Sequence, residues 1–83
     1  MYLHIGQDWM IPFAEIIGIF QRSLVDRSPE FRHLFHRWRV EGRVWGDWDE
    51  AKTVILTEEY LYLSSISAHT LLRRVERHEL QFE

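Results

Sequence analysis

The sequence predicts an α+β fold in which a small, mostly antiparallel sheet carries two helices, at about residues 28–42 and 67–80. Two segments combine a helix-capping residue with apolar positions at helical spacing, and the segments between them are rich in β-branched and aromatic residues. The chain has 83 residues, which is the size of one small domain. We therefore expect a single domain spanning residues 1–83.

The first helix has the clearest boundaries. Ser28 and Pro29 are a typical N-cap and first helical residue, and Gly42 is a typical residue just beyond a helix end. Between them, the apolar residues follow the i, i+3, i+4, i+7 spacing of a helix packed on a core: Phe31, Leu34, Phe35 and Trp38. We therefore expect Trp38 to be buried.

The second helix shows the same pattern near the C-terminus. Ser67 is its expected N-cap, and its apolar positions repeat the helical spacing: Ala68, Leu71, Leu72 and Val75. Three arginines point away from this stripe: Arg73, Arg74 and Arg77.

The remaining segments are expected to be strands. Residues 2–5 and 9–11 flank a turn at Gly6–Asp8, and Pro12 ends the second of these short strands. Residues 15–20 are expected to form a buried strand. Residues 53–56 and 60–63 should pair as a hairpin with Glu58 and Glu59 at its tip, and residues 44–45 should add a strand before it.

Composition argues against several function classes. The chain has no cysteine, which excludes disulfides and thiolate chemistry, and no apolar run approaches the roughly 18 residues of a membrane span. Neither a glycine-rich phosphate loop nor a nucleophile elbow is present, and His33 and His36 lack a third metal ligand at motif spacing. We therefore expect a protein that is not an enzyme, with no catalytic residues, no cofactor and no metal.

Charge is unevenly distributed along the chain. Six arginines and only three acids lie in residues 22–43, whereas residues 44–60 hold Lys52 and five acids. On the first helix, Arg32, Arg39 and Arg43 are spaced to share one face that tracks DNA phosphates, with Arg37 nearby. Alternatively, the basic segment of one subunit pairs head to tail with the acidic segment of the next.

Three segments stand out together: Met-Tyr-Leu-His-Ile-Gly at residues 1–6, Glu-Ile-Ile-Gly-Ile-Phe at residues 15–20, and Thr-Val-Ile-Leu-Thr-Glu-Glu-Tyr-Leu-Tyr-Leu-Ser-Ser-Ile-Ser-Ala-His-Thr-Leu at residues 53–71. With these segments the chain resembles the RemA/RemB family of extracellular matrix regulators, most closely its RemB branch. The resemblance implies a small bacterial cytoplasmic regulator of biofilm matrix genes. It also implies a ring-shaped homo-oligomer that binds double-stranded DNA, and a related RemA-type subunit as a further partner.

The resemblance transfers one DNA contact, Lys52, which ends the loop before the hairpin. RemA-like chains carry arginine where this chain has Glu15, and an arginine-rich loop where it has Gly-Asp-Trp-Asp-Glu-Ala at residues 46–51. The DNA-binding residues expected from the sequence are therefore the following: Arg32, Arg37, Arg39, Arg43 and Lys52. The alternative is a ring-forming protein-interaction module of the same family that has lost DNA binding.

Overall fold

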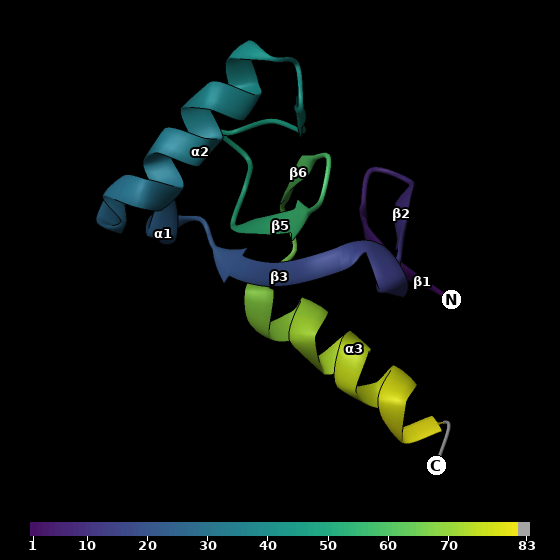
Figure 1. Cartoon of the computed structure of the whole chain (residues 1–83). Coiled ribbons are helices and arrows are strands. Elements are labelled where there is room, and N and C mark those ends of the chain that lie inside the picture. The colour runs from purple at the N-terminus through teal and green to yellow at the C-terminus, as the bar shows by residue number, and fades with distance from the viewer. Residues whose placement is uncertain (82–83) are drawn as a thin grey trace.

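The computed structural model describes the backbone of residues 1–81 and the side chains of residues 1–77. It confirms an α+β fold, with helices packed on both sides of a central sheet (Figure 1). The elements follow in the order β1 (Tyr2–Gly6), β2 (Trp9–Pro12), the 3-10 turn η1 (Phe13–Glu15), β3 (Ile16–Gln21), α1 (Ser23–Arg27), α2 (Pro29–Val40), β4 (Val44–Trp45), β5 (Thr53–Thr57), β6 (Leu61–Ser64) and α3 (Ala68–Gln81).

Helices α2 and α3 begin where their capping residues predict. The Ser28 hydroxyl accepts a hydrogen bond from the Phe31 amide at 3.2 Å, and Pro29 opens α2. In the same way, the Ser67 hydroxyl accepts from the Thr70 amide at 3.2 Å at the start of α3. Each cap satisfies an amide that has no partner inside its helix.

The central sheet has the strand order β3-β5-β6-β4. Strands β5 and β6 form the predicted antiparallel hairpin, with the exposed Glu58 and Glu59 in its turn. Strand β4 pairs with β6 in parallel, with Val44 beside Leu61 and Trp45 beside Tyr62. Strands β1 and β2 form a second, two-stranded sheet, so the prediction of one sheet is wrong.

Two further predictions are corrected. Strand β3 is an edge strand rather than a buried one, and the Ile17 side chain is 59% exposed. The helix count is also wrong, because the chain folds a third helix, α1, between β3 and α2. A helix of five residues is too short to show an apolar repeat from which the sequence could predict it.

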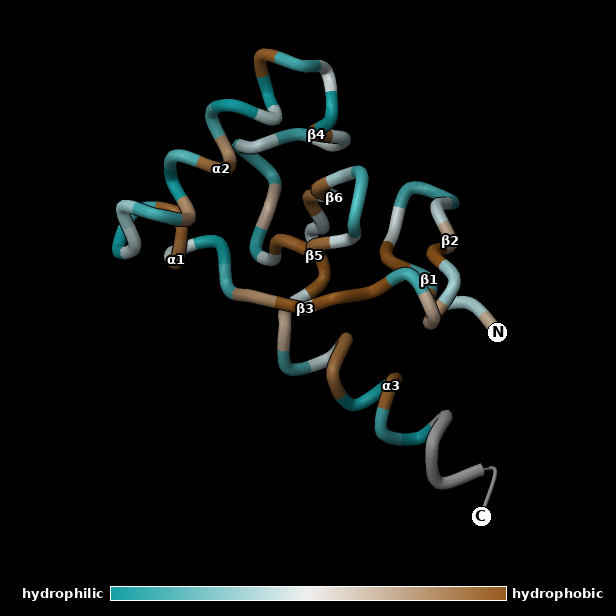
Figure 2. Tube along the Cα trace, viewed as in Figure 1, coloured by the Kyte–Doolittle hydropathy of each residue, from teal (hydrophilic) through white to brown (hydrophobic). Residues whose placement is uncertain are grey.

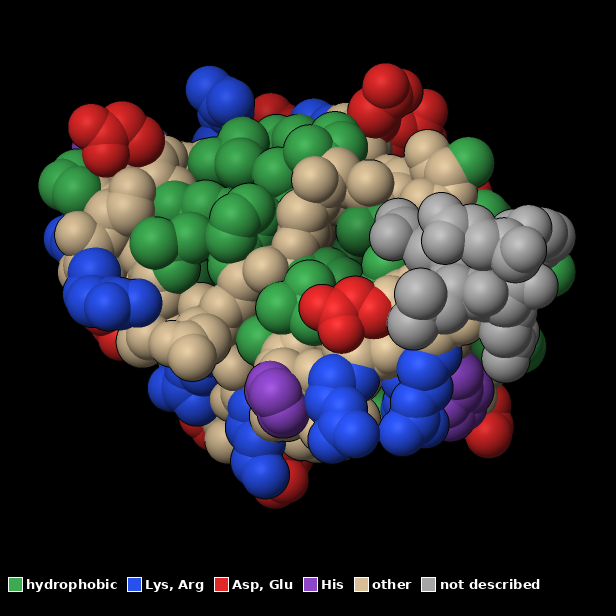
Figure 3. Space-filling model, turned by 90° about the horizontal axis from the view of Figure 1, so that it is seen from below, with side chains coloured by type: hydrophobic (Ala, Val, Ile, Leu, Met, Phe, Trp, Pro, Cys, Tyr) green, Lys and Arg blue, Asp and Glu red, His purple; other side chains and the backbone are tan. Residues whose placement is uncertain are grey.

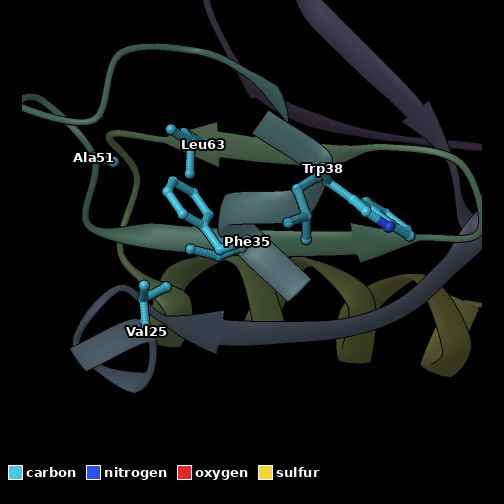
Figure 4. Close-up of a cluster of buried hydrophobic side chains, with 7 residues drawn as sticks. Val25, Phe35, Trp38, Ala51 and Leu63 are labelled. Atoms are coloured by element: carbon cyan, nitrogen blue, oxygen red, sulfur yellow. The ribbon is translucent and has the colours of Figure 1, made fainter. Parts of the chain in front are cut away.

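The central sheet separates two hydrophobic cores, because successive residues of a strand point to opposite faces. On the α2 side lie the buried residues Val25, Phe35, Trp38, Ala51, Val54, Leu61 and Leu63, most of them labelled in Figure 4. On the other side lie Leu3, Ile5, Ile11, Ile55 and Leu71, contributed by β1, β2, β5 and α3. Figure 2 shows the hydrophobic stretches of β3 and β5 in the middle of the molecule, between α2 and α3.

One serine joins the two sheets. The buried Ser64 hydroxyl donates to the Ile5 carbonyl oxygen at 2.6 Å and accepts from the Ile66 amide at 3.0 Å. The β1–β2 hairpin is therefore fastened to β6 as well as packed on it. This attachment fixes the position of Trp9 on β2 relative to Trp45 and Tyr62.

Candidate nucleic-acid interface

The five cations predicted to bind DNA lie in three different parts of the structure. Arg32 is on α2, but its guanidinium group turns back to the end of α1. Its Nη2 donates to the Asp26 carbonyl oxygen at 2.8 Å, and its Nε donates to the Val25 carbonyl oxygen at 3.3 Å. Carbonyls at a helix end lack partners within the helix, so Arg32 has a structural role in capping α1.

Arg43 lies beyond the end of α2, so the prediction that it shares a helix face with Arg32 and Arg39 is wrong. Its guanidinium group stacks 3.8 Å from the centre of the Trp38 ring. It also donates to the carbonyl oxygens of Glu59 at 2.7 Å and Glu58 at 3.1 Å, and pairs with Glu41 at 2.9 Å. Arg43 therefore ties the β5–β6 turn to the end of α2.

Arg37 and Arg39, in contrast, are exposed on the last turns of α2. Within the described part of the chain, neither guanidinium group has a hydrogen-bond or ion-pair partner. These two side chains are free to meet an anion. They lie on the α2 side of the central sheet.

Lys52 lies elsewhere, in the segment that leads into β5. Its backbone joins the surrounding elements, because the Lys52 amide donates to the Ser64 carbonyl oxygen at 2.8 Å and its carbonyl oxygen accepts from the Arg22 amide at 3.0 Å. Its exposed side chain lines an open hollow of about 360 Å³ with the first residues of α3, among them His69. The fold thus places Lys52 at the N-terminal end of α3.

Helix α3 continues this basic surface. His69, Arg73 and Arg77 are exposed and spaced four residues apart, so they lie on one face of α3. Seen from the α3 side, blue and purple side chains follow one another along one edge of the molecule (Figure 3). Together we call Lys52, His69, Arg73 and Arg77 the α3 surface. The four-residue spacing of the three α3 residues is visible in the sequence, but the proximity of α3 to Lys52 is not.

The neighbouring Arg74 is partly engaged, since its Nη1 donates to the His4 carbonyl oxygen at 2.8 Å and links α3 to β1. Arg22, at the rim of the same hollow, donates to the Trp48 carbonyl oxygen at 3.0 Å and stacks on the Trp48 ring at 4.1 Å. Arg74 and Arg22 therefore stabilise the structure next to the α3 surface.

Three acidic groups gather in a different part of the molecule, whereas Glu76 is exposed on α3 itself. Glu15, Glu58 and Glu59 line a hollow of about 250 Å³ at the start of β3 and the β5–β6 turn. This arrangement repels phosphate, and it does not include the α3 surface.

Within the described residues, no three histidine or acidic side chains gather in a way that could hold a metal ion. None of the helices described there has the length and apolar content needed to cross a membrane.

One comparison with known proteins identifies a relative. The chain is 28% identical over 78 residues to Extracellular matrix regulatory protein B of Bacillus subtilis strain 168, and the alignment covers 92% of this chain and 91% of that protein. No protein-family model matches the chain. The relationship to the RemA/RemB family that the sequence motifs predicted is confirmed by this match.

Proposed function

We propose that this relative of Extracellular matrix regulatory protein B is a cytoplasmic regulator of extracellular matrix genes. In this proposal it is not an enzyme, and it acts on double-stranded DNA as a ring-shaped homo-oligomer. Two observations support the proposal. One is the regulatory role in the relative's name, since that protein aligns with this chain over nearly its whole length. The other is the clustering of unpaired cations on the α3 surface.

The α3 surface is the part of the molecule that fits a phosphate backbone best. Lys52, Arg73 and Arg77 are exposed, and none of their side chains has a partner in the described part of the chain. Three charges provide little affinity for DNA alone, because the affinity grows with the number of counterions released and each phosphate contact releases only about one. Repeating the surface around an oligomer adds contacts at high effective concentration and raises the affinity. The proximity of Lys52 to α3 is the single observation that carries this assignment.

The competing assignment places DNA on Arg37 and Arg39 of α2. Helices α2 and α3 lie on opposite sides of the central sheet (Figure 1), so a duplex that lies flat against one of them does not reach the other. Neutralising each pair of cations in turn distinguishes the two assignments. Changing Lys52 and Arg73 to Gln removes two charges from the α3 surface. Changing Arg37 and Arg39 to Gln removes two from α2 and is the matched control.

The experiment measures duplex affinity against salt concentration, together with the solution mass of each variant. We expect Lys52→Gln with Arg73→Gln to keep the wild-type mass and to make the slope of log affinity against log salt shallower by about 1.8, from about 0.9 per lost phosphate contact. The α2 variant should keep the phosphate-dependent slope as long as it keeps the wild-type mass, and a joint fall of mass and affinity in it would assign α2 to assembly rather than to DNA contact. Loss of affinity at unchanged mass in the α2 variant would instead place DNA on α2.

A second candidate function is a ring-forming protein-interaction module without DNA binding. The observation that favours it is the acidic hollow at Glu15, Glu58 and Glu59, since Glu15 stands where RemA-like chains carry arginine. If the wild-type chain binds no duplex even at about 50 mM salt, this candidate replaces the first. Mass measurements with and without duplex, and with a RemA-type subunit, then show which assembly forms.

A further inference from the structure

Three aromatic residues from separate strands form an open pocket. Trp9 comes from β2, Trp45 from β4 and Tyr62 from β6. The Trp9 ring meets Trp45 edge-on at 6.1 Å and Tyr62 edge-on at 6.3 Å between ring centres. Together with Asp8, Met10 and Ile11 they line a hollow of about 300 Å³, which we call the aromatic pocket. The parallel pairing of β4 with β6 brings Trp45 beside Tyr62.

The aromatic surface continues beyond the pocket and is poorly covered. Tyr60 lies 6.1 Å from both Trp45 and Tyr62, measured between ring centres. Trp45 is 48% exposed and Met10 is 58% exposed. Exposed apolar surface of this kind, grouped around a hollow, is typical of a binding site rather than of ordinary solvent-facing surface.

The electrostatics of the pocket favour a positively charged occupant. Asp8 lines the pocket, and its carboxylate has no partner in the described part of the chain. Burial, followed by the nearby charges of Glu15, Tyr60 and Glu59, raises the pKa of the Tyr62 phenol above its ordinary value of 10.0. Aromatic faces are themselves electron-rich, and an organic cation held among them gains cation–π energy. Among the residues that the structure describes, no arginine or lysine lines the pocket.

The chain itself indicates which cation fits. It holds nine arginines and one lysine, and it twice places a guanidinium group over an indole ring: Arg43 on Trp38 at 3.8 Å and Arg22 on Trp48 at 4.1 Å. A planar guanidinium group stacks on aromatic rings, whereas the lysine ammonium group is compact and strongly hydrated. Trp9 and Trp45 offer the same kind of ring, but neither holds an arginine within the described structure.

Apart from the arginines of the α3 surface, two arginines without partners in the described structure lie on the far side of the molecule. Arg37 and Arg39 are exposed on α2, which covers one face of the central sheet. Trp9 and Tyr62 belong to the core on the opposite face. In the described structure neither of these arginines lines the chain's own pocket or stacks on its rings, but a second copy can present them there. A row of subunits joined by such a head-to-tail contact has a free pocket at one end and free arginines at the other. It closes into a ring when the rotation between neighbouring subunits brings these two ends together.

We propose that the aromatic pocket binds an arginine side chain, Arg37 or Arg39, from α2 of a second copy of this chain. This inference rests on the oligomeric part of the proposed function and supplies its contact. It uses a surface separate from Lys52 and α3, so variants of the α3 surface should lose duplex binding without losing assembly. The pocket accepts the guanidinium group among Trp9, Trp45 and Tyr62, and Asp8 balances its charge.

The test compares solution mass by sedimentation across matched variants of the full chain. Trp45→Leu keeps an apolar side chain but removes the aromatic face, whereas Trp45→Phe keeps one. Asp8→Asn removes a charge at a left-handed backbone position, φ 64°, which asparagine also tolerates. Asp49→Asn, an exposed acid outside the pocket, is its control. Circular dichroism shows that each variant is folded.

We expect Trp45→Leu, Asp8→Asn and the pair Arg37→Gln with Arg39→Gln to weaken assembly about tenfold or more, toward the single-chain mass of 10.2 kDa. Trp45→Phe should retain more of the assembly than Trp45→Leu, and Asp49→Asn should keep the wild-type mass. Added N-acetylarginine amide should dissociate the wild type, whereas the neutral citrulline analogue should not.

The proposal is overturned if Trp45→Leu and Asp8→Asn keep the wild-type mass, if the citrulline analogue dissociates the assembly as well as arginine does, or if the wild type is a monomer. Each of these results leaves duplex binding by the α3 surface standing, because that binding is measured separately. Conversely, failure to bind duplex leaves the mass measurements intact. Binding of arginine amide without self-association would point to a free cation or another protein as the occupant. That result also overturns the proposal that a second copy of this chain fills the pocket.

Discussion

Single side chains show how this chain uses arginine for two purposes. Arg32 and Arg43 direct their guanidinium groups at backbone carbonyls and hold α1 and the β5–β6 turn in place. Arg37 and Arg39, a few residues away, have no such partners in the described structure. In the sequence these four arginines look alike, because they lie on one segment. Only the positions of backbone carbonyls elsewhere in the fold distinguish the arginines that stabilise the structure from those that are free to bind a partner.

Trp38 is the side chain on which the α2 core most depends. It is 8% exposed, packs in the cluster of Figure 4, and carries Arg43 on its ring. We expect Trp38→Ala to lower the free energy of unfolding by about 3 to 5 kcal/mol, because the cavity adds to the lost burial. Denaturant unfolding measures this loss. Val40→Ala, at a position 89% exposed, should change it by less than about 0.5 kcal/mol, and an equal effect of both variants would contradict the burial of Trp38.

Tyr62 makes the stability of the fold depend on pH at alkaline values. Its pKa is raised in the folded state, so as pH rises the unfolded chain releases the phenol proton first and is favoured. The stabilising effect is complete below the ordinary pKa of 10.0 and is lost as pH rises through the folded pKa. We expect Tyr62→Phe to lose less stability than wild type between about pH 9 and pH 11. Equal losses would contradict this, and Tyr2→Phe is the control for removing one phenol.

At the scale of elements, the sequence predicts what is local and misses what is long-range. Ser28, Pro29 and the apolar stripe locate α2, because caps and helical periodicity act over a few residues. The parallel pairing of β4 with β6 is not visible in the sequence, because a two-residue strand has no periodicity and the paired residues, such as Val44 and Leu61, are far apart in the chain. The aromatic pocket depends on that pairing, so the sequence did not predict it. The family resemblance predicts Lys52 as a DNA contact, but it does not predict the neighbours that Lys52 has on α3.

Strand β4 depends on a glycine at its end. Gly46 has φ 117°, and a Cβ atom there would lie 2.6 Å from the Leu63 carbonyl oxygen of β6. Gly42 also has positive φ, 75°, but a Cβ atom there would meet nothing within 4 Å. We expect Gly42→Ala to cost about 1 to 2 kcal/mol of conformational strain. Gly46→Ala should cost more and should shift the fluorescence of the neighbouring Trp45, and equal costs would contradict the close approach to β6.

At the scale of the whole molecule, three surfaces have different chemistry. The α3 surface is basic, the last turns of α2 carry unpaired arginines, and the aromatic pocket has an acidic rim. Because these surfaces do not overlap, one subunit of the proposed assembly would have room for two neighbours and a duplex at the same time. A net charge of -3 conceals this arrangement, since it averages surfaces of opposite sign.

The two cores on opposite faces of the central sheet share only its strands. Local unfolding follows such boundaries, so the α2 layer and the layer of β1, β2 and α3 can each open while the other stays packed. The arginine donors belong to the first layer and most of the aromatic pocket to the second. A subunit held by neighbours at both surfaces must keep both layers closed, because a partner that binds only the closed form lowers the population of every opened one. Assembly of this small chain would therefore suppress partial unfolding that the isolated subunit undergoes freely, and the subunits at the ends of an incomplete ring would be the first to be degraded.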